Sequence, residues 1–526
     1  MKRAFKGLIL REGPDRSYDA VIIGAGIGGL ICANLLARSG LRVLLVEQHY
    51  MAGGYCSTFR RKGYTFDAAT HFYPLLGNLD TITGKLLQDL GSTTGWVKMD
   101  PVDHFHFPDG SSFSVPSDFK LYLAKLKAEF PEEAEALDRF FATVREVYLL
   151  GLLHYFRGRD TDRLDRYRDL TLREVLDSYF RDKKLKLLLT ADCPHWGSPP
   201  GRTSFVFDSM LRLSYFLGNY YPRGGSQAFA DELASRFEQM GGHVLMNSMV
   251  VRILIEKKAA CGVEIETGPV RTRFLRRVRA DVVISNGDLL LTLERLIGTE
   301  HFDQSYLEGI RRLRPTYPCF LAHIGLKNMP TDVLRRAQGY YWNDWDAERA
   351  GRGALKFKIF VPTLFEPEMA PPGCHIVIIQ KITEIDYRAV HNWPSHKGAL
   401  ERYVFSNLER LMPGFSEKIV VKLTASARTS HRYTLNHQGA MLGWEMSPDQ
   451  LGGRRPGIVG PIKNLYFTGH WTQPGGGITP VIVSAMQVAK RITENSRLSL
   501  AAHSVISAGA GLNSRGPDSC RAGEEQ

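Results

Sequence analysis

Two spacings of apolar residues near the start of the chain predict a strand, a helix and a second strand. Residues 20–23 form a short apolar run that is partly β-branched, which is typical of a buried parallel strand. Residues 30–38 predict a helix that ends before Gly40, and residues 43–46 (Val-Leu-Leu-Val) predict the second strand. A unit of this kind indicates an α/β domain built on a mostly parallel sheet.

Glycines join the first strand to the helix in the pattern Gly24-x-Gly26-x-x-Gly29, and Glu47 follows the second strand. In a dinucleotide site the first glycine permits a tight turn, the second lets a pyrophosphate approach the backbone, and the third lets helix and strand pack closely. The helix N-terminus favours phosphate, and a carboxylate placed like Glu47 accepts hydrogen bonds from a ribose. The motif, read with its strands and helix, therefore predicts dinucleotide binding.

A second glycine pair, Gly53-Gly54, comes soon after Glu47. It suggests further backbone contact with a long dinucleotide, which a site for NAD does not need. This pair favours FAD as the cofactor.

Beyond this unit, the pattern predicts two domains that alternate along the chain, as expected for 526 residues. The fold class is α/β: a doubly wound, Rossmann-like FAD-binding domain of the glutathione-reductase type, with a second, mixed α+β substrate domain. The FAD-binding segments are residues 18–91, 222–288 and 456–497, and the substrate segments are 92–221 and 289–455. A basic arm (1–17) precedes them and a disordered tail (498–526) follows.

The first substrate segment combines short strands with helices. Pro108-Asp109-Gly110 predicts a hairpin turn, and helices are expected over residues 118–127, 131–156 and 171–190, with Ser117 as an N-cap and a capping box at Thr171 and Glu174. The aromatic stretch 205–221 fits a core helix, the wall of an apolar tunnel, or a surface that dips into a membrane.

Composition and charge limit the partners. The net charge is +12, but the basic residues are dispersed and show no recognition motif, so nucleic acid is not expected and an anionic membrane surface is the better partner. The most apolar run, residues 147–156, is too short to span a bilayer. The seven cysteines include no CxxC pair, which argues against a disulfide framework or a metal site. We expect a cytoplasmic protein, peripherally associated with a membrane.

Four stretches together resemble the FAD-dependent phytoene desaturase, carotenoid isomerase and retinol saturase superfamily. They are the first glycine motif with Glu47, the pair Gly53-Gly54, residues 222–251, and residues 465–477. The motif Gly443-Trp-Glu-Met-Ser-Pro448, followed by residues 464–469 and Pro474-Gly-Gly-Gly477, resembles this superfamily more than amine oxidases in general. By this resemblance the FAD pyrophosphate, adenosine ribose, adenine and flavin ring lie beside matching positions, which are Gly24, Gly26, Gly29, Glu47, Gly53, Gly54, Val251 (through its backbone), Gly469, Gly477, Ile478 and Thr479.

The resemblance implies an FAD-dependent oxidoreductase whose substrate is a long lipophilic polyene isoprenoid. Desaturation, saturation and flavin-dependent cis–trans isomerisation all fit the same pocket. Two other classes remain open: an amine or protoporphyrinogen oxidase on the same fold, and an isoprenoid carrier without catalysis.

Candidate acid/base residues are Glu445, His470 and His71. A buried Glu445 with a raised pKa could transfer a proton, or it could simply pair with Arg454 or Arg455. His470 follows Gly469 and so lies near the expected flavin ring, while His71 fits a structural role better.

Overall fold

The strand–helix–strand unit predicted at the start of the chain forms the centre of a seven-stranded sheet. The computed structural model describes residues 17–157, 162–190, 193, 197–269 and 271–510, so all of the predicted basic arm except Ser17 lies outside the described residues. In this sheet β10, β2, β1, β13 and β19 run parallel, and β12 and β11 continue it in antiparallel pairing. The strands are β1 (Ser17–Ile23), β2 (Val43–Val46), β10 (His243–Leu245), β11 (Met249–Glu256), β12 (Ala259–Thr267), β13 (Phe274–Ser285) and β19 (Leu465–Phe467).

Helices cover both faces of this nucleotide sheet, as the predicted doubly wound fold requires. One face packs against helices from three distant parts of the chain, and the other packs against short helices that follow β13. The first group is α1 (Ile27–Arg38), α2 (Ile82–Asp89), α9 (Ser226–Gln239) and α15 (Ile478–Ala510), and the second is α10 (Leu289–Leu291) and α11 (Gln304–Arg311).

A second seven-stranded sheet, of mixed direction, forms the centre of the substrate domain. Its order is β18-β14-β17-β16-β15-β7-β8, in which only the β15–β7 pair is parallel. The strands are β7 (Asp103–His106), β8 (Ser112–Val115), β14 (Cys319–Lys327), β15 (Gly339–Trp342), β16 (Leu355–Phe360), β17 (Cys374–Ile382) and β18 (Ile419–Ala425). Smaller sheets join β3 (Thr58–Arg61) to β4 (Tyr64–Asp67), and β5 (Tyr73–Pro74) and β6 (Trp96–Lys98) to β9 (Asn219–Pro222).

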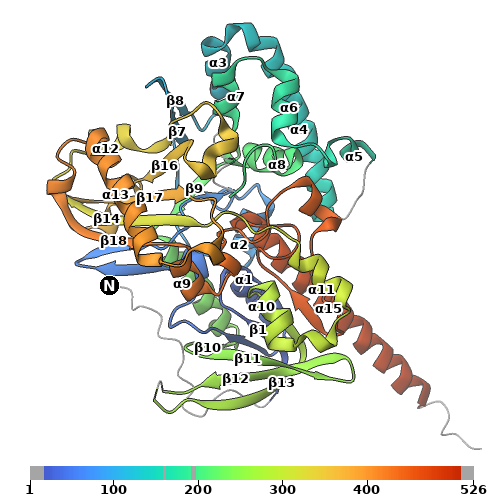
Figure 1. Cartoon of the computed structure of the whole chain (residues 1–526). Coiled ribbons are helices and arrows are strands. Elements are labelled where there is room, and N and C mark those ends of the chain that lie inside the picture. The colour runs from blue at the N-terminus through green and yellow to red at the C-terminus, as the bar shows by residue number, and fades with distance from the viewer. Residues whose placement is uncertain (1–16, 158–161, 191–192, 194–196, 270, 511–526) are drawn as a thin grey trace, which may run out of the picture.

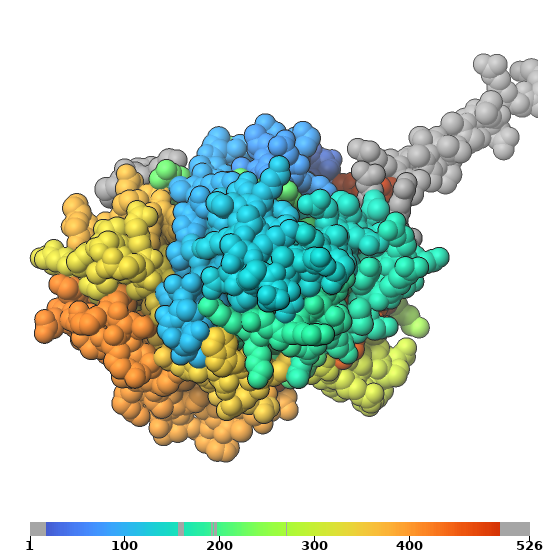
Figure 2. Space-filling view, turned by 90° about the horizontal axis from the view of Figure 1, so that it is seen from above, coloured from blue at the N-terminus to red at the C-terminus, as the bar shows by residue number. Residues whose placement is uncertain are grey.

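Helices lie on both sides of the substrate sheet. The outer face packs against α12 (Thr331–Ala337) and α13 (Trp393–Leu411). A group of helices caps the molecule in Figure 1, and in Figure 2 this group covers the upper surface beside the part that carries the sheet. These helices are α3 (Phe119–Glu129), α4 (Ala134–Arg157), α5 (Asp162–Arg168), α6 (Leu172–Tyr179), α7 (Lys183–Thr190) and α8 (Phe205–Phe216); α14 (Ala427–Thr434) follows β18.

Local predictions in the helical region are partly confirmed. The turn at residues 108–110 joins β7 to β8, and Thr171 and Glu174 form the expected capping box. The single helix expected over 171–190 is wrong, because Phe180 is extended and Asp182 starts a new helix by accepting a hydrogen bond from Leu185 N–H (2.8 Å). Asp118, not Ser117, caps α3.

The structure adds detail at two of the predicted segment limits. The second substrate segment is expected to begin at residue 289, and Leu289, Leu293 and Leu307 share a buried cluster with Val250 and Val283 of the nucleotide sheet. Their apolar side chains pack against apolar side chains of β11, β12 and β13 on one face of the nucleotide sheet. The helix α15 continues to Ala510, so it includes residues 498–510 of the expected tail; residues 511–526 lie outside the described residues. In the described part of the chain no helix is long and apolar enough to cross a membrane.

Candidate active site

A cavity of about 770 Å³ extends from the nucleotide sheet to the substrate sheet. Its lining includes residues at the carboxyl ends of β1 and β2, where open α/β sheets bind ligands. It also includes residues of β14, β17 and β18 on the substrate sheet. The two predicted domains therefore contribute to one continuous space.

The predicted glycine motif lies at the nucleotide end of this cavity. Gly24 has φ +93°, a conformation that favours glycine, and both Gly24 and Gly26 line the cavity. Gly26 is the N-cap of α1 and carries no capping side chain, so the first N–H groups of the helix are free to bind an anion. Gly29 does not line the cavity: a Cβ there would lie 2.1 Å from the Gly24 carbonyl oxygen, so it serves close helix–strand packing.

Glu47 is held in place by backbone N–H groups. Its Oε2 accepts a hydrogen bond from Ala25 N–H (2.7 Å) and its Oε1 accepts one from His49 N–H (2.8 Å). Burial raises the pKa of this carboxyl, while those backbone hydrogen bonds favour the ionised form. The carboxylate lines the cavity with lone pairs still available for the hydroxyls of a ribose.

The second glycine-rich region reaches the same cavity from the other end of the chain. Four residues around the start of α15 line it, which are Gly469, Gly477, Ile478 and Thr479. The glycine pair Gly53-Gly54 also lines the cavity, and Gly53 pairs with Gly26. The Thr479 hydroxyl donates to the Pro74 carbonyl (3.0 Å), which ties the start of α15 to β5. Because α15 begins at Ile478, its positive N-terminal end faces the cavity.

Besides Gly29, one other predicted cofactor position does not line the cavity. Val251 is not among the described residues that line the cavity, whereas its neighbours Ser248, Met249 and Val250 are. Sequence reasoning also missed Asn286, whose amide donates to the Gly24 carbonyl (3.2 Å) at the end of β13. The only signal for Asn286 was its place directly after an apolar strand.

His470 lines the cavity as a neutral imidazole. The indole N–H of Trp471 donates to Asn436 Oδ1 (3.0 Å), which identifies that atom as the oxygen, so His470 Nε2 (3.2 Å away) must also donate to it. Burial, together with the charge of Arg455, lowers the pKa of His470 to about 3. At neutral pH this side chain holds its proton on Nε2 and is not an imidazolium acid.

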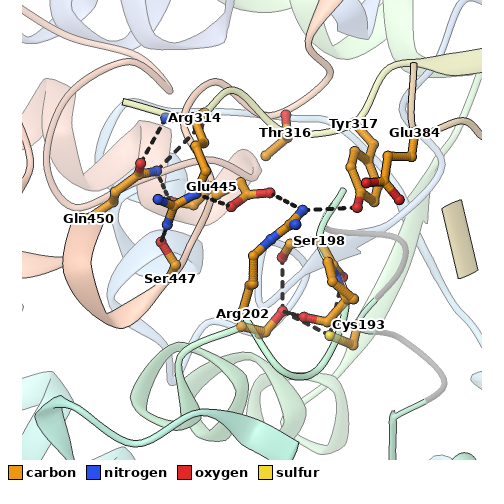
Figure 3. Close-up of polar contacts among 12 residues, drawn as sticks. Cys193, Ser198, Arg202, Arg314, Thr316, Tyr317, Glu384, Glu445, Ser447 and Gln450 are labelled. Carbon is orange, nitrogen blue, oxygen red and sulfur yellow. Dashed lines mark hydrogen bonds and ion pairs between the residues drawn. The ribbon is translucent and has the colours of Figure 1, made fainter. Parts of the chain in front are cut away.

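Glu445 lies outside the cavity, between two arginines (Figure 3). Its Oε1 is 2.7 Å from Arg202 and its Oε2 is 3.0 Å from Arg314. Of the two expected partners, Arg454 pairs with Asp169, and Arg455 donates to the backbone carbonyl of Glu445 (3.2 Å) and not to its carboxylate. Burial raises the pKa of the Glu445 carboxyl and the two guanidinium groups oppose that shift. Contacts of this kind suit a structural ion pair better than proton transfer to a substrate.

The substrate end of the cavity is mostly apolar. Phe72, Leu211 and Met441 line it together with the inner face of the substrate sheet. His71 also lines it, with Nδ1 bonded to the Ala69 carbonyl (3.1 Å). The surroundings suit a long apolar ligand that reaches toward the nucleotide end.

The glycine-rich nucleotide end and the apolar substrate end belong to one continuous cavity. This arrangement defines the class of the protein: a two-domain, FAD-dependent oxidoreductase. The chain belongs to the family described as flavin containing amine oxidoreductase, whose model matches residues 27–493. Together with its curated relatives, this match places the chain among the FAD-dependent carotenoid isomerases and retinol saturases, as the motifs indicated.

Curated relatives match nearly the whole chain. It is 31% identical over 526 residues to all-trans-retinol 13,14-reductase of Danio rerio, covering 89% of this chain and 85% of the relative. It is 27% identical over 510 residues to prolycopene isomerase 1, chloroplastic, of an Oncidium hybrid cultivar, covering 90% and 84%. These matches favour an enzyme over the non-catalytic carrier.

Solved structures share the fold. An oxidoreductase from Methanosarcina mazei aligns with a TM-score of 0.65 at 18% identity, covering 90% of this chain and 99% of that one. Putrescine oxidase bound to putrescine aligns with a TM-score of 0.62 at 14% identity, covering 92% and 100%. They confirm the α/β FAD-binding domain with a mixed substrate domain.

Proposed function

We propose that this FAD-dependent oxidoreductase acts on a polyene isoprenoid of the carotenoid or retinoid class, by saturation or by cis–trans isomerisation. The observation that carries the proposal is the continuity of one cavity from the glycine-rich nucleotide end to the apolar face of the substrate sheet. The relatives that act on a retinoid or a carotenoid support it. Desaturation, the third predicted reaction, has no counterpart among these relatives.

The residues at the nucleotide end fit FAD. We assign the pyrophosphate to the backbone of Gly24 and Gly26 and the start of α1, and the adenosine ribose to Glu47. Gly469, Gly477 and the start of α15 suit the flavin ring, because a helix N-terminus stabilises negative charge. When bound, FAD supplies the redox chemistry; the chain binds and orients the polyene and keeps water away from it.

The assignment of Glu47 predicts the behaviour of one variant. Glu47→Ala removes the only acidic side chain positioned at the end of β2 and should reduce FAD occupancy at least tenfold, because a buried charged hydrogen bond to the ribose is lost. The absorbance of bound flavin per protein measures this. Full occupancy in the variant would contradict the ribose assignment.

The reaction is tested with flavin-loaded protein and separate polyenes. The protein is reduced under anaerobic conditions and incubated with all-trans-retinol or with cis-configured lycopene, and products are separated by chromatography and weighed by mass spectrometry. A gain of two hydrogens identifies saturation, and a changed absorbance spectrum at constant mass identifies isomerisation. Glu47→Ala protein without flavin is the control. Unchanged polyenes in the presence of bound FAD would refute the proposal.

We also propose that the protein binds peripherally to an anionic membrane, in which its lipophilic substrate is dissolved. The net charge of +12 supports this through attraction to anionic lipid.

A further inference from the structure

Arg455 carries a buried guanidinium that lies behind the loop of residues 469–477, where the flavin ring is assigned. The residue is 2% exposed. Its Nη2 donates to the His470 carbonyl (2.9 Å) and its Nε donates to the Thr472 carbonyl (3.2 Å). A Cβ added at Gly475 would lie 3.9 Å from the Arg455 Cζ. The guanidinium therefore packs against this loop at three positions along its length.

The other contacts of Arg455 are with the segment that precedes it. Nη2 also donates to the Trp444 carbonyl (3.1 Å), and Nη1 donates to the Glu445 carbonyl (3.2 Å), the Gln450 carbonyl (3.4 Å) and Met446 Sδ (3.5 Å). Every one of these acceptors is uncharged. The hydrogen bonds of Arg455 are thus satisfied by the backbone and by one sulfur, and its positive charge is not cancelled by them.

Among the described residues, Arg455 forms no ion pair. The Glu445 carboxylate is turned toward two other arginines (Figure 3). The titratable side chains beside Arg455 are His470 and Tyr155, and both are neutral at pH 7 because burial lowers the pKa of the first and raises that of the second. Burial lowers the pKa of the guanidinium itself to about 9, so it is charged at neutral pH. A buried charge without a counter-charge costs stability, and such a cost is typical of a functional site.

The charge of Arg455 acts on the flavin end of the cavity. Burial is the main cause of the lowered pKa of His470, and the charge of Arg455 adds to it. His470 lines the cavity next to Gly469, and Gly476 and Gly477 line it at the far end of the same loop. Since a buried charge is screened less than an exposed one, its field extends to the place assigned to the flavin ring.

We propose that Arg455 makes the bound flavin easier to reduce, because it holds a buried positive charge behind the loop of residues 469–477. The inference rests on the proposed position of the flavin ring and deepens it. Two electrons and one proton convert oxidised flavin to its anionic reduced form, so reduction adds one negative charge to the ring. A cation that is already fixed in place stabilises this charge without rearrangement. The N-terminal end of α15 acts in the same sense, and Arg455 adds to it.

The first test measures the midpoint potential of the bound flavin at pH 7, by slow reduction beside a reference dye, and needs no polyene. Arg455→Gln should shift the equilibrium roughly tenfold toward oxidised flavin, which lowers the potential by about 30 mV for a two-electron couple. Arg455→Lys keeps the charge and loses most of the hydrogen bonds, so its potential should stay near that of the wild type. Arg454→Gln is the matched control, because Arg454 is 46% exposed and pairs with Asp169, and it should leave the potential unchanged.

These variants separate charge from hydrogen bonding. If Arg455→Lys and Arg455→Gln lowered the potential alike, Arg455 would have only a structural role and the proposal would be overturned. An equal shift in Arg454→Gln would also overturn it, since the cause would then be net charge and not this buried site. Wild-type protein that binds no flavin would instead refute the proposed function.

A second measurement does not depend on the folding of any variant. Sulfite bonds reversibly to oxidised flavin, and the ring takes up the electron pair as negative charge. A site that stabilises this charge should bind sulfite in the wild-type, flavin-loaded protein at least roughly tenfold more tightly than free FAD does. Bleaching of the flavin absorbance measures the affinity. A value no higher than that of free FAD would overturn the proposal.

Discussion

Glu445 is buried and His470 is half-buried, and the two side chains have opposite charge states: the carboxylate is ionised between two arginines, and the imidazole is neutral. Two guanidinium groups surround the Glu445 carboxylate, whereas His470 stands beside the cation Arg455 and is neutral. In each case burial is the main cause of the pKa shift; the arginines oppose it at Glu445 and add to it at His470. Neither environment resembles that of a general acid poised near neutral pH.

Replacing Glu445 by Gln should therefore affect stability more than turnover. The change leaves two arginines without their shared counter-charge, and removing one member of a buried ion pair is strongly destabilising. Because Arg202 and Arg314 are partly exposed, we expect a loss of about 1–3 kcal/mol, seen as a lower melting temperature of the flavin-loaded protein.

The control for that experiment is Asp449→Asn. Asp449 pairs with the same Arg314 (2.7 Å) but is exposed, so its removal should cost less than about 1 kcal/mol. If Glu445→Gln lowered turnover per bound flavin at an unchanged melting temperature, the acid/base hypothesis would be restored.

The state of His470 predicts a pH dependence. Its pKa of about 3 in the folded protein lies below the value of 6.5 for an unfolded histidine, so the unfolded chain binds the proton more readily. Stability is then complete above about pH 6.5 and falls as the pH decreases, by about 2 kcal/mol at pH 5. His470→Gln keeps a donor for Asn436 but does not titrate, so its unfolding free energy should fall less between pH 7.5 and pH 5. Equal losses in both proteins would exclude this cause.

At the scale of the elements, the position of α1 depends on a single missing methyl group. Gly29 lies inside α1, where an added Cβ would meet the Gly24 carbonyl oxygen at 2.1 Å. Gly29→Ala must therefore move the helix away from β1, and we expect both poor folding and loss of FAD.

Gly309, inside α11, provides a matched control because an added Cβ would find no atom within 4 Å. Gly309→Ala should leave the flavin content unchanged and stabilise the protein by about 0.5–1 kcal/mol, since alanine is the better helix former. Similar flavin contents in the two variants would argue against the close-packing role of Gly29.

Elements with a strong local signal were predictable, and side-chain directions were not. The glycine motif, the capping box at Thr171 and the hairpin turn at residues 108–110 each depend on neighbours in sequence, and the structure contains all three. The partners of Glu445 come from residues more than 130 positions away, and His323 lies on a continuous apolar strand that gives no local sign of a cavity. Such contacts depend on how distant segments pack together, and the local pattern of a single sequence does not predict that packing.

At the scale of the whole molecule, the positive charge should govern binding to membranes. We expect the flavin-loaded protein to bind vesicles that contain anionic lipid and to release them as the salt concentration rises from 0.05 M to 0.5 M, because the Debye length shortens. Sedimentation with vesicles measures this, and neutral vesicles are the control. Binding that is independent of salt would indicate insertion of apolar side chains.

The nucleotide sheet has a consequence for how the protein is made. Its parallel strands come from residues 17–46, 243–285 and 465–467, and β19 can pair with β13 only after the roughly 180 residues between them have been synthesised. A ribosome-bound chain that ends before Leu465 has neither β19 nor α15 and so cannot close the flavin end of the cavity. FAD should therefore enter only after β19 and the start of α15 have been synthesised, and stop codons anywhere before β19 should yield colourless, protease-sensitive protein.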